Sequence, residues 1–121
     1  MRNIILLEDE EILGKIYKKN LEGAGYSVIW LKTTGEVEQV IDTIHADVII
    51  LDQGIAGDDR SGLDIVPMVK AVNPKAKIIM LSNYSQFQMR QKAVEAGAMD
   101  YLVKIDTTPT KLIEYINNLF L

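Results

Sequence analysis

The chain of 121 residues contains no cysteine, only one histidine and three prolines, and no long apolar run. Without cysteine it can form neither disulfide bonds nor thiolate metal sites, which fits a reducing compartment. No apolar run approaches the roughly 18 residues of a membrane-spanning helix. The apolar run at 4–7 is too short for a secretion signal, and acidic residues follow it at once. We therefore expect a cytoplasmic protein without a membrane partner.

The chain also has little positive charge, since 13 basic against 17 acidic residues give a net charge of −4. This balance argues against direct binding of nucleic acid, whose phosphate backbone needs a positive surface. Hydrophobic residues make up 48% and charged residues 25%, as in ordinary globular proteins. Because a length of 121 residues suits one such unit, we expect residues 1–121 to form a single domain.

Five short apolar runs alternate with segments of helical periodicity. Runs that are apolar without interruption are typical of strands covered on both faces, as in a parallel sheet. The expected strands are 3–7, 26–31, 47–51, 77–81 and 100–103, and the expected helices are 11–22, 35–44, 62–72, 85–97 and 109–120. This alternation predicts an α/β fold, a three-layer, doubly wound (βα)5 arrangement with a five-stranded parallel sheet. The flavodoxin-like strand order 2-1-3-4-5 is favoured.

Residues that begin helices predict where some of these helices start. Thr34 is expected to cap the second helix, and Ser85 to open a capping box for the fourth. Thr108 followed by Pro109 has the pattern of a cap and a first-turn proline. Pro67 lies within the third helical pattern and predicts that this helix begins late, about three residues before it, because proline inside a helix removes a hydrogen bond.

Polar residues stand at the carboxyl ends of four of these strands. Glu8 and Asp9 follow the first strand, Asp52 the third, Ser82 the fourth and Lys104 the fifth. Each alone has an ordinary interpretation as a turn residue, a helix-start acid, a loop hydroxyl or a surface charge. In an open parallel sheet, however, ligands bind beyond the carboxyl ends of the strands, where the strand order reverses. The predicted topology would bring all of these residues together.

Such a set would form a site for phosphoryl transfer. Three carboxylates close together repel one another, and a divalent cation removes that cost. Mg²⁺ prefers oxygen ligands and commonly binds one or two carboxylates together with a phosphate. Lys104 would add a positive charge and Ser82 a hydrogen-bond donor. Asp52, at the end of the central strand, is the expected nucleophile and would form an aspartyl phosphate.

Four motifs, in this order and spacing, resemble the receiver domain of two-component response regulators, the CheY-like family. They are IILLEDE at 4–10, VIILD at 48–52, IIMLSN at 78–83 and DYLVK at 100–104. The resemblance covers essentially the whole chain. It implies a phosphorelay switch in which a sensor histidine kinase, a phosphotransfer protein or a small acyl phosphate phosphorylates Asp52. Such a switch acts through protein contacts and catalyses only its own phosphorylation and dephosphorylation, so it is not a metabolic enzyme.

The resemblance further implies a role for each residue of the site. Mg²⁺ would be bound by Glu8, Asp9, Asp52 and the backbone carbonyl of Gly54, and the phosphoryl oxygens would be contacted by Ser82 and Lys104. On phosphorylation Ser82 would move toward the phosphate and Tyr101 would turn inward. The surface of the fourth helix, fifth strand and fifth helix would then change, and an output protein or domain docks there. The residues at positions 54 and 84, Gly54 and Tyr84, would tune the phosphate lifetime. Either a monomer or a phosphorylation-promoted dimer fits the family.

The sequence departs from the family pattern at three places: in the loop after Asp52, after Lys104, and at Gly54 and Tyr84, two residues beyond Asp52 and Ser82. Ala56 stands where a proline is usual, and the matching glycine, Gly62, comes two residues late, so the loop 53–61 is longer. Ile105 follows the lysine, where the family commonly has a proline with a cis peptide bond. Residues 58–60 are expected to form a solvated part of the loop.

Two other functions fit some of the same residues. A Mg²⁺-dependent phosphotransferase or hydrolase on a similar sheet, such as a haloacid-dehalogenase phosphatase or a Toprim nuclease, needs a second aspartate two residues beyond Asp52, where this chain has Gly54. A receiver-like binding module insensitive to phosphorylation is disfavoured by the intact set of acids. Trp30 is expected in the core and His45 at the surface.

Overall fold

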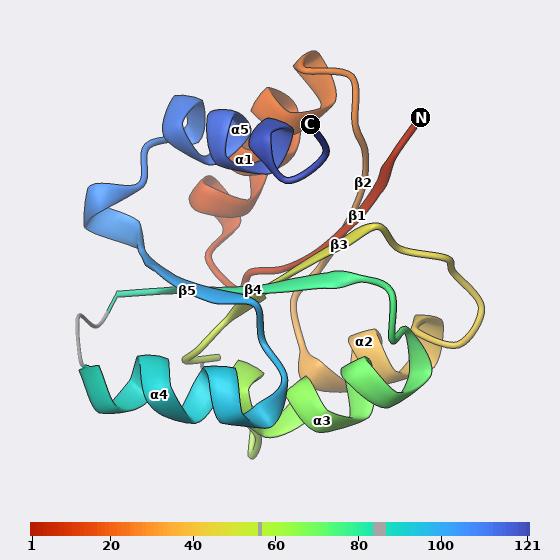
Figure 1. Ribbon diagram of the computed structural model, residues 1–121, viewed down its shortest axis with the longest axis vertical. Coiled ribbons are helices and arrows are strands. Elements are labelled where there is room, and N and C mark those ends of the chain that lie inside the picture. Colours follow the sequence, from red (N-terminus) through yellow and green to blue (C-terminus); the bar gives the residue numbers. More distant parts are fainter. Residues whose placement is uncertain (56, 84–86) are drawn as a thin grey trace.

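The structure, a computed structural model, describes residues 1–55, 57–83 and 87–121. Within these residues the strands form one parallel sheet in the predicted order, β2-β1-β3-β4-β5 (Figure 1). The strands are β1 (Asn3–Leu7), β2 (Ser27–Leu31), β3 (Val48–Asp52), β4 (Lys77–Ser82) and β5 (Asp100–Val103). The helices are α1 (Glu11–Gly23), α2 (Thr34–Val40), α3 (Gly62–Val72), α4 (Phe87–Ala96) and α5 (Pro109–Asn118), with a 3₁₀ turn at Lys104–Asp106.

Helices cover both faces of the sheet, as the three-layer prediction requires. Figure 1 shows α1 and α5 on one face and α2, α3 and α4 on the other. Side chains of β1 alternate between the two cores: Ile4 and Leu6 pack on the α1 and α5 side, whereas Ile5 and Leu7 pack on the opposite side. All four are at most 1% exposed. Burial of both strand faces explains why the central runs are apolar without interruption.

Strand β3 ends one residue later than predicted, and this places Asp52 inside the sheet. Asp52 lies opposite Leu81 of β4 in the parallel register. Its backbone is therefore part of the strand and not of the following turn. At the other end, Asp47 stands before the strand, where its side chain accepts a hydrogen bond from the Asn3 N–H at 2.8 Å.

The predicted second helix is wrong at both ends. Thr33 and not Thr34 is the N-cap, and its hydroxyl accepts a hydrogen bond from the Glu36 N–H at 3.1 Å. The helix stops at Val40 although apolar residues continue to Ile44. After Val40 the chain continues as turns, in which the N–H groups of Thr43 and Ile44 both donate to the Val40 carbonyl. The Asn73 side-chain amide donates to the carbonyl of Ile41 at 2.7 Å and attaches these turns to the end of α3.

The late start predicted for α3 is also wrong. Ser61 caps this helix in a capping box with Asp64, in which the Ser61 hydroxyl accepts from the Asp64 N–H and the Asp64 carboxylate accepts from the Ser61 N–H. Pro67 lies inside the helix but is exposed. Proline cannot donate a backbone hydrogen bond, and this helix tolerates it at an exposed position.

The remaining helix boundaries bear on the other predicted caps. Thr108 caps α5 as predicted, since its hydroxyl accepts from the Lys111 N–H at 3.2 Å and Pro109 begins the helix. The capping box predicted at Ser85 lies outside the described residues. In the described residues no peptide bond is cis, and the chain after Lys104 continues as a 3₁₀ turn. None of the described helices is both long and apolar enough to cross a membrane.

Candidate functional site

The candidate site lies at the carboxyl edge of the sheet. Leu7 of β1 pairs with Leu51 of β3, so Glu8 comes next to Asp52. Glu8 is 1% exposed, Asp52 4% and Ser82 0%. Polar groups are rarely buried to this extent unless they are paired, so the contacts among them decide what the site can do.

Lys104 joins the first and third strands from the far side of β4. Its Nζ lies 2.7 Å from Oε1 of Glu8 and 3.0 Å from Oδ2 of Asp52. The Lys104 side chain is only 6% exposed. One ammonium therefore neutralises part of the charge of two buried carboxylates, as the strand-end argument predicted.

Glu8, Asp9 and Asp52 form the acidic cluster. Each offers a carboxylate oxygen, and these oxygens all lie within 4.8 Å of one another. Glu8 and Asp52 are buried and Asp9 is half-buried, so one side of the cluster is open to solvent. Three hard oxygen donors with a net negative charge fit a divalent cation such as Mg²⁺ or Ca²⁺. Gly54, two residues after Asp52, is exposed.

The electrostatics of the acidic cluster favour such a cation. Burial raises the pKa of Asp52 to about 7, and the hydrogen bond and charge of Glu8 add to this, while Lys104 opposes it. Burial alone would lower the pKa of Lys104, but its bonds to Glu8 and Asp52 outweigh burial and raise it. A carboxyl group with a pKa near 7 is partly protonated at neutral pH and then a poor nucleophile. A cation at the cluster would favour the ionised form.

Gly62 lies against the backbone of the central strand. A Cβ atom at this position would overlap the carbonyl oxygen of Asp52. The Gly62 N–H also donates to the carbonyl of Gln53 at 3.1 Å. The longer loop 53–61 thus still returns to the strand end, and a glycine ten residues after Asp52 makes the close approach possible.

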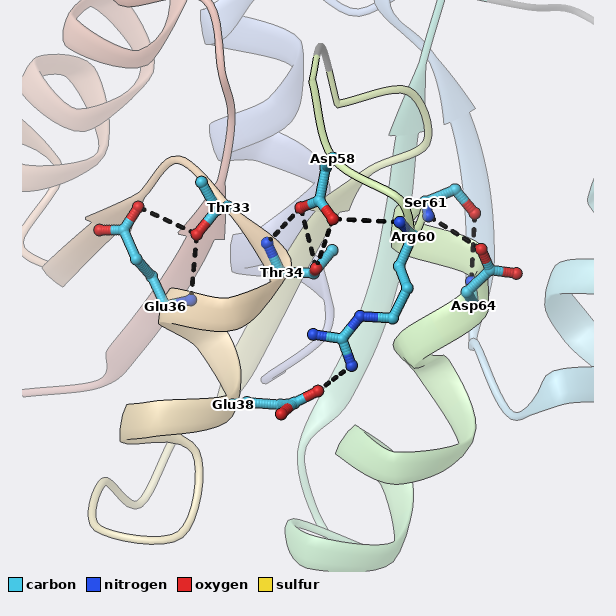
Figure 2. Close-up of polar contacts among 8 residues, drawn as sticks. All are labelled: Thr33, Thr34, Glu36, Glu38, Asp58, Arg60, Ser61 and Asp64. Carbon is cyan, nitrogen blue, oxygen red and sulfur yellow. Dashed lines mark hydrogen bonds and ion pairs between the residues drawn. The ribbon is translucent and has the colours of Figure 1, made fainter.

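Asp58 contradicts the expectation of a purely solvated loop. Figure 2 shows its carboxylate between Thr34 and Arg60. It accepts from the Thr34 N–H at 2.8 Å, from the Thr34 hydroxyl and from the Arg60 N–H at 3.0 Å. These bonds, that of the Thr34 backbone first, lower the pKa of Asp58. Arg60 in turn forms an ion pair with Glu38 of α2. The loop after Asp52 is therefore attached to the start of α2.

The two residues predicted to change position when the protein is phosphorylated lie on β4 and β5. Ser82 ends β4 and is fully buried, and Tyr101 of β5 is 2% exposed. Tyr101 packs in the core on the side of α3 and α4, so this structure has its ring turned inward. Tyr84 and Ala56, to which the sequence also assigned positions in the family pattern, lie outside the described residues.

A model of the family described as "Response regulator receiver domain" matches residues 4–117. The chain belongs to this family. The receiver is 27% identical over 117 residues to the chemotaxis protein CheY of Thermotoga maritima, which covers 96% of this chain and 95% of that protein. The family predicted from the four motifs is thereby confirmed.

Two solved structures share the receiver fold. The BeF3-activated receiver domain of DrrB, from Thermotoga maritima, superposes with a TM-score of 0.86 at 27% identity and covers 98% of this chain and 96% of that one. A response regulator from Burkholderia pseudomallei has a TM-score of 0.86 at 21% identity, covering 98% of this chain and 72% of that one. At 21% identity the second structure shows the fold alone.

The chain spans only part of several of the curated relatives that it matches. It covers 22% to 44% of several transcriptional regulatory proteins, although it covers nearly all of CheY. Receivers are signalling switches of two-component systems and not classical enzymes, and they interact with histidine kinases and output domains. They bind a divalent metal at an acidic pocket, and this chain has a cluster of one glutamate and two aspartates whose oxygens could hold one.

Proposed function

We propose that this receiver is a phosphoacceptor switch in which Asp52 takes up the phosphoryl group. The observation that carries the proposal is the burial of Asp52 within hydrogen-bond distance of Lys104 and beside Glu8 and Asp9. A nucleophile, a fixed cation and a metal-binding set meet at one point. The likeness to a receiver activated with BeF3 supports phosphoryl chemistry at this point.

The reaction is a displacement at phosphorus. An oxygen of the Asp52 carboxylate attacks, a phosphorus–oxygen bond forms, and the bond from phosphorus to the donor breaks. Mg²⁺, held by Glu8, Asp9, Asp52 and the carbonyl of Gly54, would supply Lewis-acid neutralisation of the phosphoryl oxygens. Lys104 balances charge that develops on the phosphoryl group, and the Ser82 hydroxyl donates to one of its oxygens.

The donor and the output belong to the same proposal. A sensor histidine kinase, a phosphotransfer protein or a small acyl phosphate would supply the phosphoryl group in the cytoplasm. Movement of Ser82 and the position of Tyr101 would then change the α4-β5-α5 surface, where an output protein or domain docks, with or without dimerisation. Gly54 and Tyr84 would set how easily water reaches the phosphate. One receiver domain over residues 1–121 suffices for these steps.

The test is phosphorylation by acetyl phosphate, read by intact mass. Wild-type protein with Mg²⁺ should gain one phosphoryl group, and Asp52→Asn should gain none. Chelation of the metal should abolish the gain in the wild type. The absence of an adduct, or an adduct that survives Asp52→Asn, would overturn the proposal. Turnover of phosphate esters that depends on Asp52 would instead indicate an enzyme on this sheet.

A further inference from the structure

We propose that Trp30 is a positioning residue for the acidic cluster, an inference that rests on the proposed function. Trp30 lies on β2, next to β1, the strand that Glu8 and Asp9 follow. Its indole Nε1 donates a hydrogen bond to the backbone carbonyl of Glu8 at 2.8 Å. It is the only tryptophan in the chain, and from the sequence it was expected only to fill the core.

Residues of β2 form hydrogen bonds with both the N–H and the carbonyl of Glu8. The Glu8 N–H donates to the carbonyl of Leu31 at 2.9 Å, and the Glu8 carbonyl accepts from Trp30. That carbonyl belongs to the planar peptide unit that joins Glu8 to Asp9. Fixing this plane sets the direction in which both carboxylates leave the chain. The bond from Trp30 therefore orients two of the three acids that would bind the metal.

The indole is itself held in place from α1 and from the end of β2. A Cβ atom at Gly14 of α1 would overlap the indole ring, so glycine at this position gives the ring its space. The ammonium of Lys32 lies 5.0 Å from the ring centre, in cation–π distance, and pairs with Glu11 in the first turn of α1. The donor thus has a defined position relative to the turn after β1.

Loss of the indole N–H would disturb this turn. Glu8 is 1% exposed, so its carbonyl would either stay buried without its donor or turn toward water. Turning would rotate the peptide plane and move both carboxylates. Partners that orient metal ligands typically change metal affinity by about 10- to 100-fold when they are removed. We expect the lower end, because Trp30 acts through the backbone and not on a carboxylate.

The first test is Trp30→Phe, which removes the N–H and keeps an aromatic ring. Binding of Mg²⁺, measured by calorimetry, should weaken by about tenfold. Phosphorylation by acetyl phosphate should need correspondingly more Mg²⁺ than in the wild type. A purely structural role would lower the melting temperature and leave Mg²⁺ affinity unchanged.

The matched control is Tyr26→Phe. Tyr26 precedes β2, at the opposite end of the sheet, and its hydroxyl donates a hydrogen bond to Asn117. This variant therefore also loses one hydrogen-bond donor from an aromatic side chain. Its Mg²⁺ affinity should equal that of the wild type. If Trp30→Phe does not fold, a chain with benzothienylalanine at position 30 replaces it in the test. This analogue keeps the shape of the indole ring and lacks the N–H.

A second variant moves the ring and keeps the donor. Gly14→Ala should displace the indole and weaken Mg²⁺ binding as well. Wild-type Mg²⁺ affinity in Trp30→Phe or its analogue would overturn the positioning role. If the wild type itself neither binds Mg²⁺ nor takes up a phosphoryl group, the proposed function fails, and that result is read before any variant is compared.

Discussion

Gly62 lets the start of α3 lie directly against the backbone of Asp52. Because a Cβ atom would overlap the Asp52 carbonyl oxygen, Gly62→Ala must move the helix or the strand end. We expect the free energy of unfolding to fall by about 1–3 kcal/mol, the usual cost of overpacking. Phosphorylation by acetyl phosphate should slow in the same variant. Urea denaturation and the phosphorylation rate measure the two effects.

The control is Gly23→Ala at the end of α1, where no heavy atom lies within 4 Å of the added Cβ. Its stability should stay within about 0.5 kcal/mol of the wild type. Equal stability of Gly62→Ala and Gly23→Ala would show that the close approach to Asp52 is not limiting.

Among single residues, the sequence predicted the polar side chains at the carboxyl ends of the strands. It missed the residues whose hydrogen bonds join distant parts of the chain. Glu8, Asp52 and Lys104 could be found because parallel strands bring their carboxyl ends to one edge. The bond from Trp30 joins residues 22 positions apart, and that from Thr34 to Asp58 joins residues 24 apart. A local pattern contains no signal for either pair.

Among the elements, α2 depends on the loop after β3 for its first turn. Asp58→Ala removes the acceptor of the Thr34 N–H and hydroxyl and should lower the free energy of unfolding by about 1–2 kcal/mol, as for loss of a helix cap. Because these bonds lower the pKa of Asp58, the stabilisation is present above the ordinary carboxyl pKa and is lost as pH falls through the folded value.

Asp59 provides the matched control, since it is adjacent and exposed. Urea denaturation at pH 7 should show Asp59→Ala within about 0.5 kcal/mol of the wild type. The difference between Asp58→Ala and the wild type should shrink in acid. A difference that persists unchanged at pH 2.5 would contradict the assigned role of the carboxylate.

Side chains from α4 and α5 meet at the start of β5. Arg90 donates to the Tyr101 carbonyl at 2.9 Å and to Asp100 at 2.8 Å. Tyr115 donates to the other oxygen of Asp100 at 2.8 Å. Burial, and then the bond to Asp100, raises the pKa of Tyr115, so its hydroxyl stays protonated and donating. This set connects all three elements of the proposed output surface.

Because Arg90 and Tyr115 share Asp100, their effects on stability should be coupled. Tyr115→Phe should cost about 1 kcal/mol. A double-mutant cycle with Arg90→Ala should give a coupling of at least about 0.5 kcal/mol. The same cycle with Lys92→Ala, an exposed position on α4, should be additive. Additivity in the Arg90 cycle would show that the two residues act independently.

The order of elements could be predicted because continuous apolar runs and amphipathic segments alternate along the chain. The end of α2 could not, since the apolar pattern continues to Ile44 through turns in which the N–H groups of Thr43 and Ile44 both donate to the Val40 carbonyl. Pro67 led to the wrong prediction that α3 begins late. Proline is tolerated inside this helix because it lies on the exposed side, and which side is exposed depends on how the helix packs. The helical periodicity of apolar residues predicts that a helix exists. The residues at which it begins and ends depend on contacts with other parts of the chain.

For the whole molecule, the acidic cluster should make stability depend on pH and on divalent metal. The folded pKa of Asp52, about 7, exceeds the ordinary value of 3.8. The folded state therefore binds more protons between these values, and the contribution of Asp52 to stability falls as pH rises from about 4 to about 7. In chelator at pH 8, Asp52→Asn should be more stable than the wild type by about 1–3 kcal/mol.

Addition of Mg²⁺ should then stabilise the wild type and have little effect on Asp52→Asn, because a ligand stabilises the state that binds it. Urea denaturation at pH 5 and pH 8, with chelator or with Mg²⁺, measures all four cases. If Asp52→Asn were less stable than the wild type at pH 8 in chelator, repulsion among the buried carboxylates would not be destabilising the folded state.

The most direct measurement locates the phosphoryl group on the chain. After reaction with acetyl phosphate and Mg²⁺, borohydride reduction converts an aspartyl phosphate to homoserine, which peptide mass spectrometry identifies by position. We predict homoserine at position 52 alone, and none when the metal is chelated. Homoserine at another aspartate, or none at position 52 in the complete reaction, would contradict Asp52 as the phosphoacceptor.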